Sequence, residues 1–433
     1  MTRNSKKYLL DNLLFYLYTL GVFFLNIFFR IASRFHPKAA LWVAGRKNWR
    51  KVLAEKVGAG QNWIWFHCAS LGEFEQCRNL IEWIKTHRPT YKILITFFSP
   101  SGYEVRKNYA LADFVTYLPI DTKKNAADFL RILNPRLVFF VKYELWLNFL
   151  GEMETRDIPA ILISARVGEN SRFLTSLFAP LYKKAFRSFR HIFTQDEATK
   201  ELLRRFCGRE TITASGDTRY DRVRANRESF SEIDFLSKFT QSKCCLICGS
   251  TWPVDEKALF AAWDRLKHIP ELVMIIAPHE IHAERIQQWK EKYPTETLLF
   301  SESNQYSETH RILWVNNIGM LSRLYYYGDV AYVGGGWGSG LHNILEAATF
   351  GCAVVFGDKH HKFPEAGELI EAGGGFSVKN EKELHIVLEK LFTEDNLREK
   401  IYVSNKKFID QRSGATTTIV EWCERNAYFS TLA

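Results

Sequence analysis

Nine consecutive residues, His67–Glu75 (HCASLGEFE), offer a thiol, a hydroxyl, an imidazole and two carboxylates directly after an apolar run. A nucleophilic cysteine or serine needs a partner base in a known arrangement. The chain has no GxSxG elbow and no Cys/His signature of a known protease family. Ser70 and Glu73 instead have the S-x-x-E spacing of a capping box, and an amphipathic segment follows. We therefore expect Cys68 to be a packing residue and Glu73 to lie in the first turn of a helix.

A second candidate site is the glycine-rich segment 330–351 (VAYVGGGWGSGLHNILEAATFG). Its glycines permit close approach of the backbone to a ligand, and a helix predicted to begin near Leu341 or His342 would favour an anion. The spacing is neither a dinucleotide fingerprint nor a P-loop. Asn343 and Glu346 are three residues apart, so one helix face presents both to a ribose or a base. The alternative is an ordinary loop in which both side chains are solvated.

Further polar loops follow predicted strands of the same half of the chain. Ser250 lies in CGSTWPVDE, Pro278 and His279 lie in APHEIHAER, and the loop NNIGML spans 316–321. Several such loops at one edge of a sheet indicate nucleotide binding better than any one of them does. His279 and His282 have no third ligand nearby in the sequence, so we expect no metal site.

The first half of the chain carries three shorter candidates. SPSGYE (99–104) has the form of a strand-to-helix turn suited to a charged group, Glu144 lies in KYELW, and Arg219 lies in SGDTRYD. Each alone has a structural alternative, in which Glu144 pairs with a lysine and Arg219 pairs with a neighbouring aspartate.

The elements that position these residues form two series. From Trp63 onward, short apolar runs alternate with amphipathic stretches, which predicts βαβ units and a parallel sheet. The polar segment 222–242 is a predicted linker, after which a second such series begins. We expect a basic apolar segment over 1–50 and two doubly wound domains over 51–228 and 229–433, with ligands in a cleft at the carboxyl ends of the strands.

The formal net charge of +10 is concentrated at the N-terminus. Residues 1–51 contain ten lysines and arginines but a single acid, Asp11, so the rest of the chain is close to neutral and nucleic acid is not an expected partner. Residues 12–29 are uncharged and apolar, and basic residues rather than a cleavage site follow them. We expect membrane association through a tilted span or an interfacial helix, with Arg30–Lys51 facing cytoplasmic headgroups. A buried core helix is the alternative.

The eight cysteines are scattered along the chain, which predicts reduced thiols rather than a disulfide framework. Cys245 and Cys248 form a CxxC pair, but no second pair follows at zinc spacing, and the surrounding KCCLICGS is typical of a buried strand.

Taken together, the segments HCASLGE, SPSGYE, YELW, SGDTRYDRV, GSTWPVDE and YVGGGWGSGLHNILEAATFGCAVVFG resemble, in matching order over roughly residues 45–420, the Kdo transferases of lipopolysaccharide assembly. The resemblance implies an inverting glycosyltransferase of GT-B architecture, with an acceptor-binding first domain and a CMP-Kdo-binding second domain. Such an enzyme moves 3-deoxy-D-manno-octulosonic acid (Kdo) from CMP-Kdo to a lipid A precursor, lipid IVA, and releases CMP. It needs no cofactor and no metal, and it works at the cytoplasmic side of the inner membrane, in contact with the membrane lipids.

The resemblance also implies roles for individual residues. Glu73 falls on the general base, Glu144 on the acid that supports the transition state, and Arg219 on a basic residue that is more commonly lysine. The predicted substrate-binding residues are Ser250, Pro278, His279, Ile318, Gly319, Met320, Asn343, Ile344, Leu345 and Glu346. His279 stands where many members have arginine. Two other interpretations stay open, namely a GT-B enzyme that uses a UDP-sugar and a lipid acceptor, and a membrane-tethered nucleotide-binding protein without catalysis.

Overall fold

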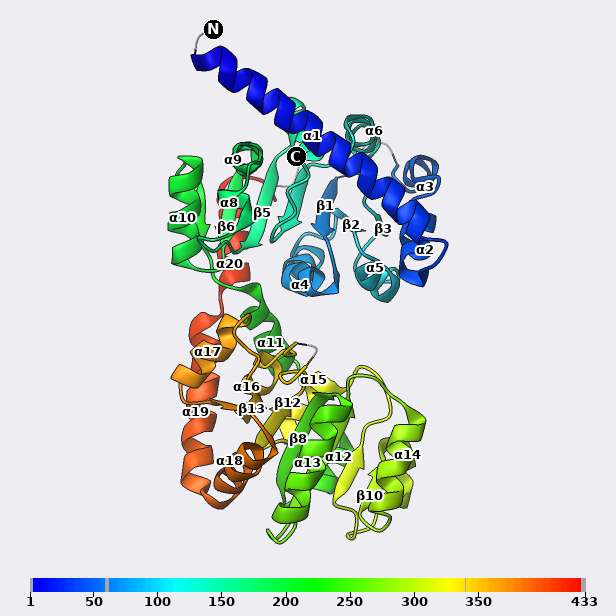
Figure 1. Cartoon of the computed structure of the whole chain (residues 1–433), viewed down its shortest axis with the longest axis vertical. Helices are drawn as coiled ribbons and strands as arrows, with labels where there is room; N and C mark the ends of the chain where they lie inside the picture. Colours follow the sequence, from blue (N-terminus) through cyan, green and yellow to red (C-terminus); the bar gives the residue numbers. More distant parts are fainter. Residues whose placement is uncertain (1–2, 59–61, 339, 430–433) are drawn as a thin grey trace. The chain divides into compact units, whose positions relative to one another are not determined.

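The computed structural model describes residues 3–58, 62–338 and 340–429, and the chain forms two compact units (Figure 1). The first unit comprises Met1–Arg222 and Gly414–Ala433, and the second comprises Val223–Ser413. The division falls within helix α11 (Thr218–Glu228), and α12 (Asp234–Thr240) follows, so much of the segment predicted as a linker is helical. The return of the C-terminal residues to the first unit has no counterpart in the predicted division at residue 228.

The first unit contains a parallel sheet of seven strands in the order β3-β2-β1-β4-β5-β6-β7. Each strand coincides with one of the apolar runs of the first series. When helices cover both faces of a parallel sheet, nearly every side chain of a strand is buried, so the strand appears in the sequence as an almost continuous apolar run. This explains why these strands could be recognised. The strands are β1 (Trp63–Cys68), β2 (Lys92–Phe97), β3 (Phe114–Tyr117), β4 (Leu137–Val141), β5 (Ala160–Ala165), β6 (His191–Thr194) and β7 (Ile212–Ala214).

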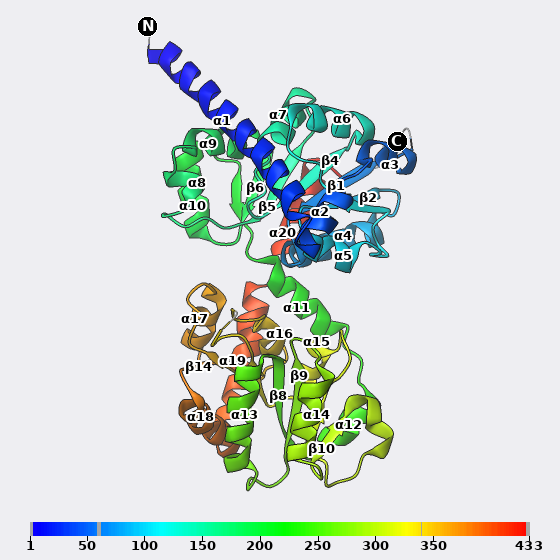
Figure 2. The same ribbon diagram turned by 45° about the vertical axis from the view of Figure 1, so that its right-hand side comes forward.

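Helices cover both faces of this sheet. Alternate residues of β1 face opposite sides, so Trp65 packs with α3, α6, α7, α9 and α10, whereas Ile64 and Phe66 pack with α4 and α20. The helices are α1 (Arg3–Ala32), α2 (Pro37–Ala44), α3 (Trp49–Lys56), α4 (Leu71–His87), α5 (Pro100–Arg106), α6 (Lys123–Leu133), α7 (Leu147–Thr155), α8 (Arg172–Thr175), α9 (Ala179–Ser188), α10 (Glu197–Cys207) and α20 (Ala415–Arg425). Figures 1 and 2 show α1 as a long rod that passes α9 and ends beside α2.

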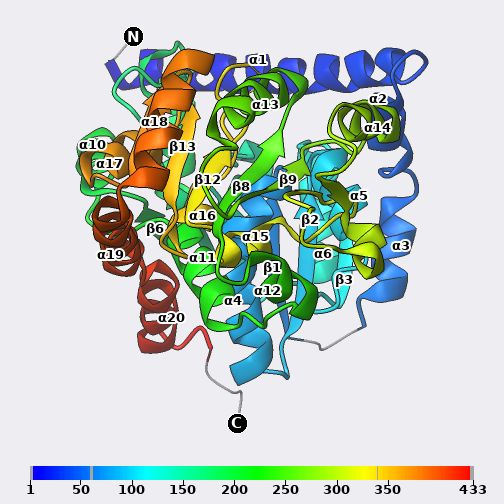
Figure 3. The same ribbon diagram turned by 90° about the horizontal axis from the view of Figure 1, so that it is seen from below.

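The second unit repeats the architecture with strand order β10-β11-β9-β8-β12-β13-β14, again parallel throughout (Figure 3). The strands are β8 (Cys244–Thr251), β9 (Leu272–Pro278), β10 (Thr297–Leu299), β11 (Ile312–Trp314), β12 (Val330–Val333), β13 (Ala353–Gly357) and β14 (Gly375–Val378). Its helices are α12, α13 (Pro253–Leu266), α14 (Ala283–Lys292), α15 (Leu321–Leu324), α16 (Leu345–Ala348), α17 (Pro364–Glu371), α18 (Glu381–Thr393) and α19 (Asp395–Arg412), with short 3₁₀ turns at Phe300–Gln305 and Tyr325–Tyr327. The prediction of two doubly wound sheets is confirmed.

The strand orders locate one switch point in each sheet. In the first unit the chain leaves β1 on one side and later returns on the other side through β4, and in the second unit β8 and β12 have the same relation. Ligands of open α/β sheets bind beside the carboxyl ends of the strands at such a point. Glu73 and Glu144 follow the two strands at the first switch point. At the second, Ser250 lies at the carboxyl end of β8, and the glycines of the 330–351 segment follow β12.

Among the described residues, one helical stretch, Asn12–Ala32 of α1, is long and apolar enough to cross a membrane. The expected apolar N-terminal helix is therefore present.

Candidate active site

Glu73 is held at the start of α4 by the predicted capping box. The backbone N–H of Ser70 donates to Glu73 Oε2 at 2.7 Å, and the Ser70 hydroxyl donates to the same oxygen at 3.0 Å. Among the hydrogen bonds of the described residues, none reaches Oε1. One oxygen thus fixes the half-buried carboxylate, and the other is available to a proton.

Gly72 leaves space beside this carboxylate. A Cβ built on Gly72 would meet only Ser70 Oγ, at 3.9 Å. Packing within the protein therefore does not require a glycine at this position, which directly precedes Glu73.

Glu144 follows β4 and has two nitrogen donors on one oxygen. His67 Nε2 lies 3.0 Å and Trp146 Nε1 lies 2.7 Å from Glu144 Oε2. The His67 ring is fully buried, and the Glu144 side chain is largely buried. The partners of Glu144 Oε2 in these two hydrogen bonds are thus an imidazole and an indole.

The hydrogen bonds of Thr96 determine which nitrogen of His67 carries a proton toward Glu144. Trp65 Nε1 can only donate, and it donates to Thr96 Oγ1 at 2.7 Å. The Thr96 hydroxyl has two acceptors within reach, His67 Nδ1 at 2.8 Å and the Phe66 carbonyl at 3.4 Å, and the shorter contact favours Nδ1. His67 Nε2 lies 3.0 Å from Glu144 Oε2, and two acceptors at that distance would repel each other, so we assign the ring proton to Nε2. The Trp146 N–H, which lies 2.9 Å from Nε2 and 2.7 Å from Glu144 Oε2, then donates to the carboxylate. The series Trp65–Thr96–His67 thus orients a donor toward Glu144.

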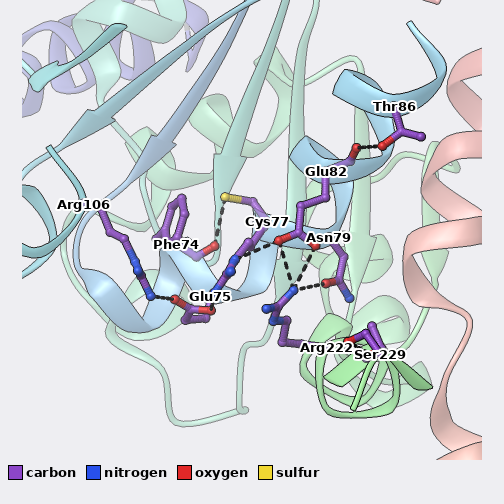
Figure 4. Close-up of polar contacts among 11 residues, drawn as sticks. Phe74, Glu75, Cys77, Asn79, Glu82, Thr86, Arg106, Arg222 and Ser229 are labelled. Atoms are coloured by element: carbon purple, nitrogen blue, oxygen red, sulfur yellow. Dashed lines mark hydrogen bonds and ion pairs between the residues drawn. The ribbon is translucent and has the colours of Figure 1, made fainter. Parts of the chain in front are cut away.

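Arg219 lies in the first turn of α11 and is folded onto Asp217. Its Nε and Nη2 lie 2.8 and 2.7 Å from Asp217 Oδ2, and its backbone N–H donates to Oδ1 at 2.9 Å. One turn later, Arg222 binds Glu82 at 2.9 Å and Asn79 at 3.3 Å, which ties α11 to α4 (Figure 4). The helices that carry Arg219 and Glu73 are therefore fixed to each other.

Tyr143 connects these groups electrostatically. Burial raises the pKa of the Tyr143 phenol, Glu73 raises it further, and the cations Arg166 and Arg219 oppose the increase. Glu73 and Arg219 thus influence the same phenol with opposite signs. The sequence analysis counted the His67 imidazole among the candidate groups but gave it no role, and it did not single out Tyr143, the neighbour of Glu144 in the YELW segment.

The remaining groups of the HCASLGEFE stretch have structural roles. The Cys68 thiol is fully buried against Cys77 with the sulfurs 3.4 Å apart, and burial raises the pKa of Cys68 well above its usual range. Glu75 forms an ion pair at 2.7 Å with Arg106 of α5 (Figure 4). Of the two glutamates in this stretch, only Glu73 has a carboxylate oxygen that no hydrogen bond of the described residues reaches.

In the second unit, Asn343 and Glu346 meet as the spacing predicts. Asn343 Nδ2 donates to Glu346 Oε1 at 3.0 Å, and Asn343 Oδ1 accepts from the backbone N–H of Leu345 at 3.2 Å. Helix α16 begins at Leu345, later than predicted. Ile344 and Leu345 are buried in the core, so their side chains do not face a ligand.

The glycines of the same segment are required by the protein's own packing. A Cβ on Gly334 would lie 2.3 Å from the carbonyl oxygen of Ser250, and one on Gly336 would lie 2.6 Å from the backbone nitrogen of Gly357. Gly335 has φ +87° and donates its N–H to buried Asp255 at 3.1 Å. Close approach of backbone to backbone, rather than to a ligand alone, explains this cluster.

Three aromatic rings of these loops form a stack in neighbouring pairs. The ring of His279, which follows Pro278 at the end of β9, has its centroid 4.6 Å from that of Trp252 and 4.4 Å from that of His342. The centroids of Trp252 and His342 are 6.5 Å apart, and Trp252 Nε1 donates to His342 Nε2 at 3.2 Å, so His279 lies beside this pair. Burial and the neighbouring His279 lower the pKa of His342 to about 4. A pocket of about 260 Å³ adjoins the stack and is lined by Trp252, Pro253, Val254, Gly335 and Gly338. Among the described residues, no group of three or more His, Cys, Asp or Glu side chains could hold a metal ion.

The remaining predicted contacts lie on the 318–320 loop and at the carboxyl end of β8. Ile318 is 92% exposed, Gly319 has φ +92°, and Met320 immediately precedes α15. Ser250 also has a positive φ, +51°, at an irregularity in the pairing of β8 with β9. The apolar side chain of Ile318 is thus exposed to solvent, which is typical of a residue that contacts a ligand or a partner.

A larger cavity of the second unit lies away from these loops. It has a volume of about 750 Å³, and it is lined by residues that precede strands, such as Lys243, Asp329 and Gly351. Because ligands of such sheets bind at the carboxyl ends of strands, we place the candidate site at the smaller pocket beside Trp252.

Comparisons with known proteins agree with the resemblance seen in the motifs. Residues 44–222 match the family model described as 3-deoxy-D-manno-octulosonic-acid transferase (kdotransferase). The chain is 25% identical to a 3-deoxy-D-manno-octulosonic acid transferase of Haemophilus influenzae over 88% of this chain and 93% of that protein, and 26% identical to one of Aquifex aeolicus over 87% and 94%. It is also 27% identical to a bifunctional glycosyltransferase/methyltransferase of Fusobacterium nucleatum, but it spans only 54% of that protein.

Solved structures share the fold at low sequence identity. A UDP-GlcNAc 2-epimerase from Neisseria meningitidis superposes with a TM-score of 0.62 at 14% identity, over 84% of this chain and all of that chain. MurG of Acinetobacter baumannii gives a TM-score of 0.52 at 13% identity, over 84% and 99%. These likenesses establish the GT-B type of fold. The sequence matches show that the chain is similar to the 3-deoxy-D-manno-octulosonic acid transferases over most of its length, and that residues 44–222 match the model of that family.

Proposed function

We propose that the protein transfers Kdo from CMP-Kdo to a hydroxyl group of a lipid A precursor, lipid IVA, with inversion at the sugar and with Glu73 as general base. The observation that carries this proposal is the geometry of Glu73, which the described hydrogen bonds fix through Oε2 alone and which directly follows Gly72, where an added Cβ would meet no atom closer than 3.9 Å. It lies at the switch point of a sheet whose residues match the Kdo transferase model.

The chemistry needs one proton acceptor and a site that tolerates charge separation. A hydroxyl is a weak nucleophile, so Glu73 Oε1 takes its proton as the hydroxyl oxygen bonds to the anomeric carbon, a step that contributes about 10²- to 10⁴-fold. The electrons of the breaking bond leave with CMP. The largely buried carboxylate of Glu144, held by His67 and Trp146, faces the positive charge that develops on the sugar. Arg219 supplies a cation for the phosphate.

The second unit offers a surface for the cytidine nucleotide. The Trp252, His279 and His342 rings provide a stacking platform, and the adjoining pocket ends at Gly335 and Gly338. The polar pair Asn343 and Glu346 stands near the same sheet edge for the ribose. The exposed loop at 318–320 and the turn at Ser250 complete the proposed donor site.

A lipid acceptor is supported by an apolar pocket in the first unit. This pocket of about 330 Å³ lies between α1, α2 and the residues after β2, and Phe28, Trp42 and Phe98 line it. The Phe98 ring lies 5.0 Å from Trp146, which donates to Glu144. An acyl chain in the pocket would therefore keep an acceptor headgroup close to the carboxylates. The cytoplasmic face of the inner membrane, where the precursor and CMP-Kdo meet, is the proposed location.

Release of CMP from CMP-Kdo in the presence of an acylated, phosphorylated glucosamine disaccharide tests the proposal. Glu73→Gln is expected to reduce turnover by about 10²- to 10⁴-fold. Glu75→Gln is the matched control, because that carboxylate is engaged by Arg106, and it is expected to keep near-normal turnover. Equal turnover of the Glu73→Gln and unaltered enzymes would refute the base assignment. Turnover only with a UDP-sugar, or nucleotide binding without turnover, would refute the reaction.

A further inference from the structure

Helix α1 has one face that packs on the first unit. Leu14 and Val22 are 1% and 7% exposed, and between them the Tyr18 hydroxyl donates to Asp121 at 2.5 Å. These residues are spaced by four and so share one side of the helix. Asp121 is itself fixed, because it accepts the backbone N–H groups of Asn148 and Phe149, so the contact has a rigid base.

The same side of the first unit meets α1 again near its C-terminal end. The Phe29 ring stacks on Trp42 of α2 with centroids 4.2 Å apart, and Trp42 packs edge-on against Phe98. Leu14 and Phe29 are separated by about 22 Å along a helix that rises 1.5 Å per residue. A spanning helix needs about 20 residues within a hydrocarbon layer about 30 Å thick. Leu14 and Phe29 both contact the folded part of the first unit. If α1 crossed the bilayer, part of that unit would have to lie within the hydrocarbon layer.

The other face of α1 is apolar and uncovered. It carries large exposed side chains over five turns, namely Leu13, Tyr16, Leu17, Leu20, Phe23, Phe24, Phe28 and Ile31. Exposed cations follow at its C-terminal end, among them Arg30, Arg34 and Lys38. A long apolar face beside a row of cations has the chemistry of an anionic lipid surface.

We propose that α1 lies in the plane of an anionic membrane surface, with this exposed face in the acyl region, and that it does not cross the bilayer. Both ends of α1 are then on the side of the membrane that holds the folded units. The inference rests on the membrane association within the proposed function but not on Kdo transfer. It also opens the pocket lined by Phe28 and Trp42 toward the lipid, since Phe28 belongs to both surfaces.

Protease accessibility of an N-terminal tag on the full-length protein tests the orientation. In inverted inner-membrane vesicles the added protease is expected to remove the tag, and in intact spheroplasts the tag is expected to survive. Digestion in spheroplasts together with protection in inverted vesicles would overturn the proposal, because it would place the two ends of α1 on opposite sides. This readout uses the unaltered chain and does not depend on activity.

Flotation of the purified protein with vesicles tests the surface. Binding to phosphatidylglycerol vesicles is expected to exceed binding to phosphatidylcholine vesicles at least tenfold and to weaken with salt. Leu20→Glu combined with Phe24→Glu is expected to reduce binding tenfold or more, whereas Ile386→Glu, at an apolar residue of α18 that is 61% exposed, is expected to leave it unchanged. Unchanged binding of the double variant, or no binding to either vesicle, would overturn the assignment of this face to lipid. Circular dichroism verifies the fold of each variant.

Discussion

The hydrogen bond from His67 to Glu144 gives a sharp test of how the site is built. Gln and Asn replace the imidazole in complementary ways, because the amide nitrogen of Gln reaches the position of Nε2 while that of Asn reaches only the position of Nδ1. His67→Gln therefore keeps a donor for Glu144, and His67→Asn keeps only the contact with Thr96. The two variants separate the role of the bond from the role of the buried volume.

The magnitude follows from the kind of bond that is lost. A hydrogen bond to a charged group contributes about 1.5 to 3 kcal/mol. If the bond acts in the transition state, His67→Asn lowers kcat/KM for CMP release by about 10- to 150-fold, since each 1.4 kcal/mol is a factor of ten. His67→Gln is expected to lose less than tenfold. Thermal unfolding is measured in parallel, because both variants disturb a fully buried site.

A double-mutant cycle with Glu144→Gln isolates the interaction. Residues in direct contact show coupling energies of about 0.5 to 3 kcal/mol, whereas independent residues add. If His67→Asn and Glu144→Gln have additive effects on kcat/KM, the donor assigned to His67 Nε2 does not act through Glu144. Equal losses in the Asn and Gln variants would contradict the assignment in the same way.

Three further predictions follow from the geometry. Gly72→Ala is expected to leave the unfolding free energy unchanged or to raise it by up to about 1 kcal/mol, because the added Cβ meets no close atom. The same change is expected to impair turnover, because the methyl group would occupy space proposed for the acceptor. Denaturation measures the first effect, and CMP release measures the second. Trp252→Ala is expected to weaken binding of CMP by about 1 to 3 kcal/mol, a loss seen by calorimetric titration, if the ring stacks on cytosine. His191, buried in β6, has its pKa lowered to about 4 by burial, with a smaller contribution from Arg209. Because the unfolded chain binds this proton more readily, stability falls as the pH drops from about 6.5 to 4, by about 3 kcal/mol, and His191→Gln is expected to remove that part of the pH dependence measured by denaturation.

The strands and the capping box could be predicted because their signals are local. Each strand is a short apolar run, and the two residues of the capping box, Ser70 and Glu73, are three positions apart. Both patterns can therefore be recognised within a few consecutive residues. The return of α20 to the first unit could not be predicted in this way. It depends on Asp221, which accepts the backbone N–H groups of Gly414 and Thr416, and nothing in either segment alone indicates the other.

The same distinction separates the site residues that were found from those that were missed. His67 acquires its role from Thr96 on the next strand, and the ring stack joins Trp252 to His342, ninety residues away. The glycines of the 330–351 segment were recognised, but their cause was only partly identified. The sequence shows only that these positions are glycines. The structure gives the reason at Gly334, where a side chain would collide with the carbonyl oxygen of Ser250.

Glu73 is proposed both to cap helix α4 and to accept a proton, and these two roles would conflict if they used the same carboxylate oxygen. The cap occupies Oε2, and proton transfer needs Oε1, so the base can be protonated without releasing the N–H of Ser70. Gln at this position still accepts that N–H through its carbonyl oxygen but takes no proton. Glu73→Gln should therefore keep the unfolding free energy within about 0.5 kcal/mol while turnover collapses, whereas Glu73→Ala should lose both turnover and about 0.5 to 2 kcal/mol of stability. If Gln destabilised the fold as much as Ala does, the loss of activity would reflect a broken helix start, and the carboxylate would be scaffold alone.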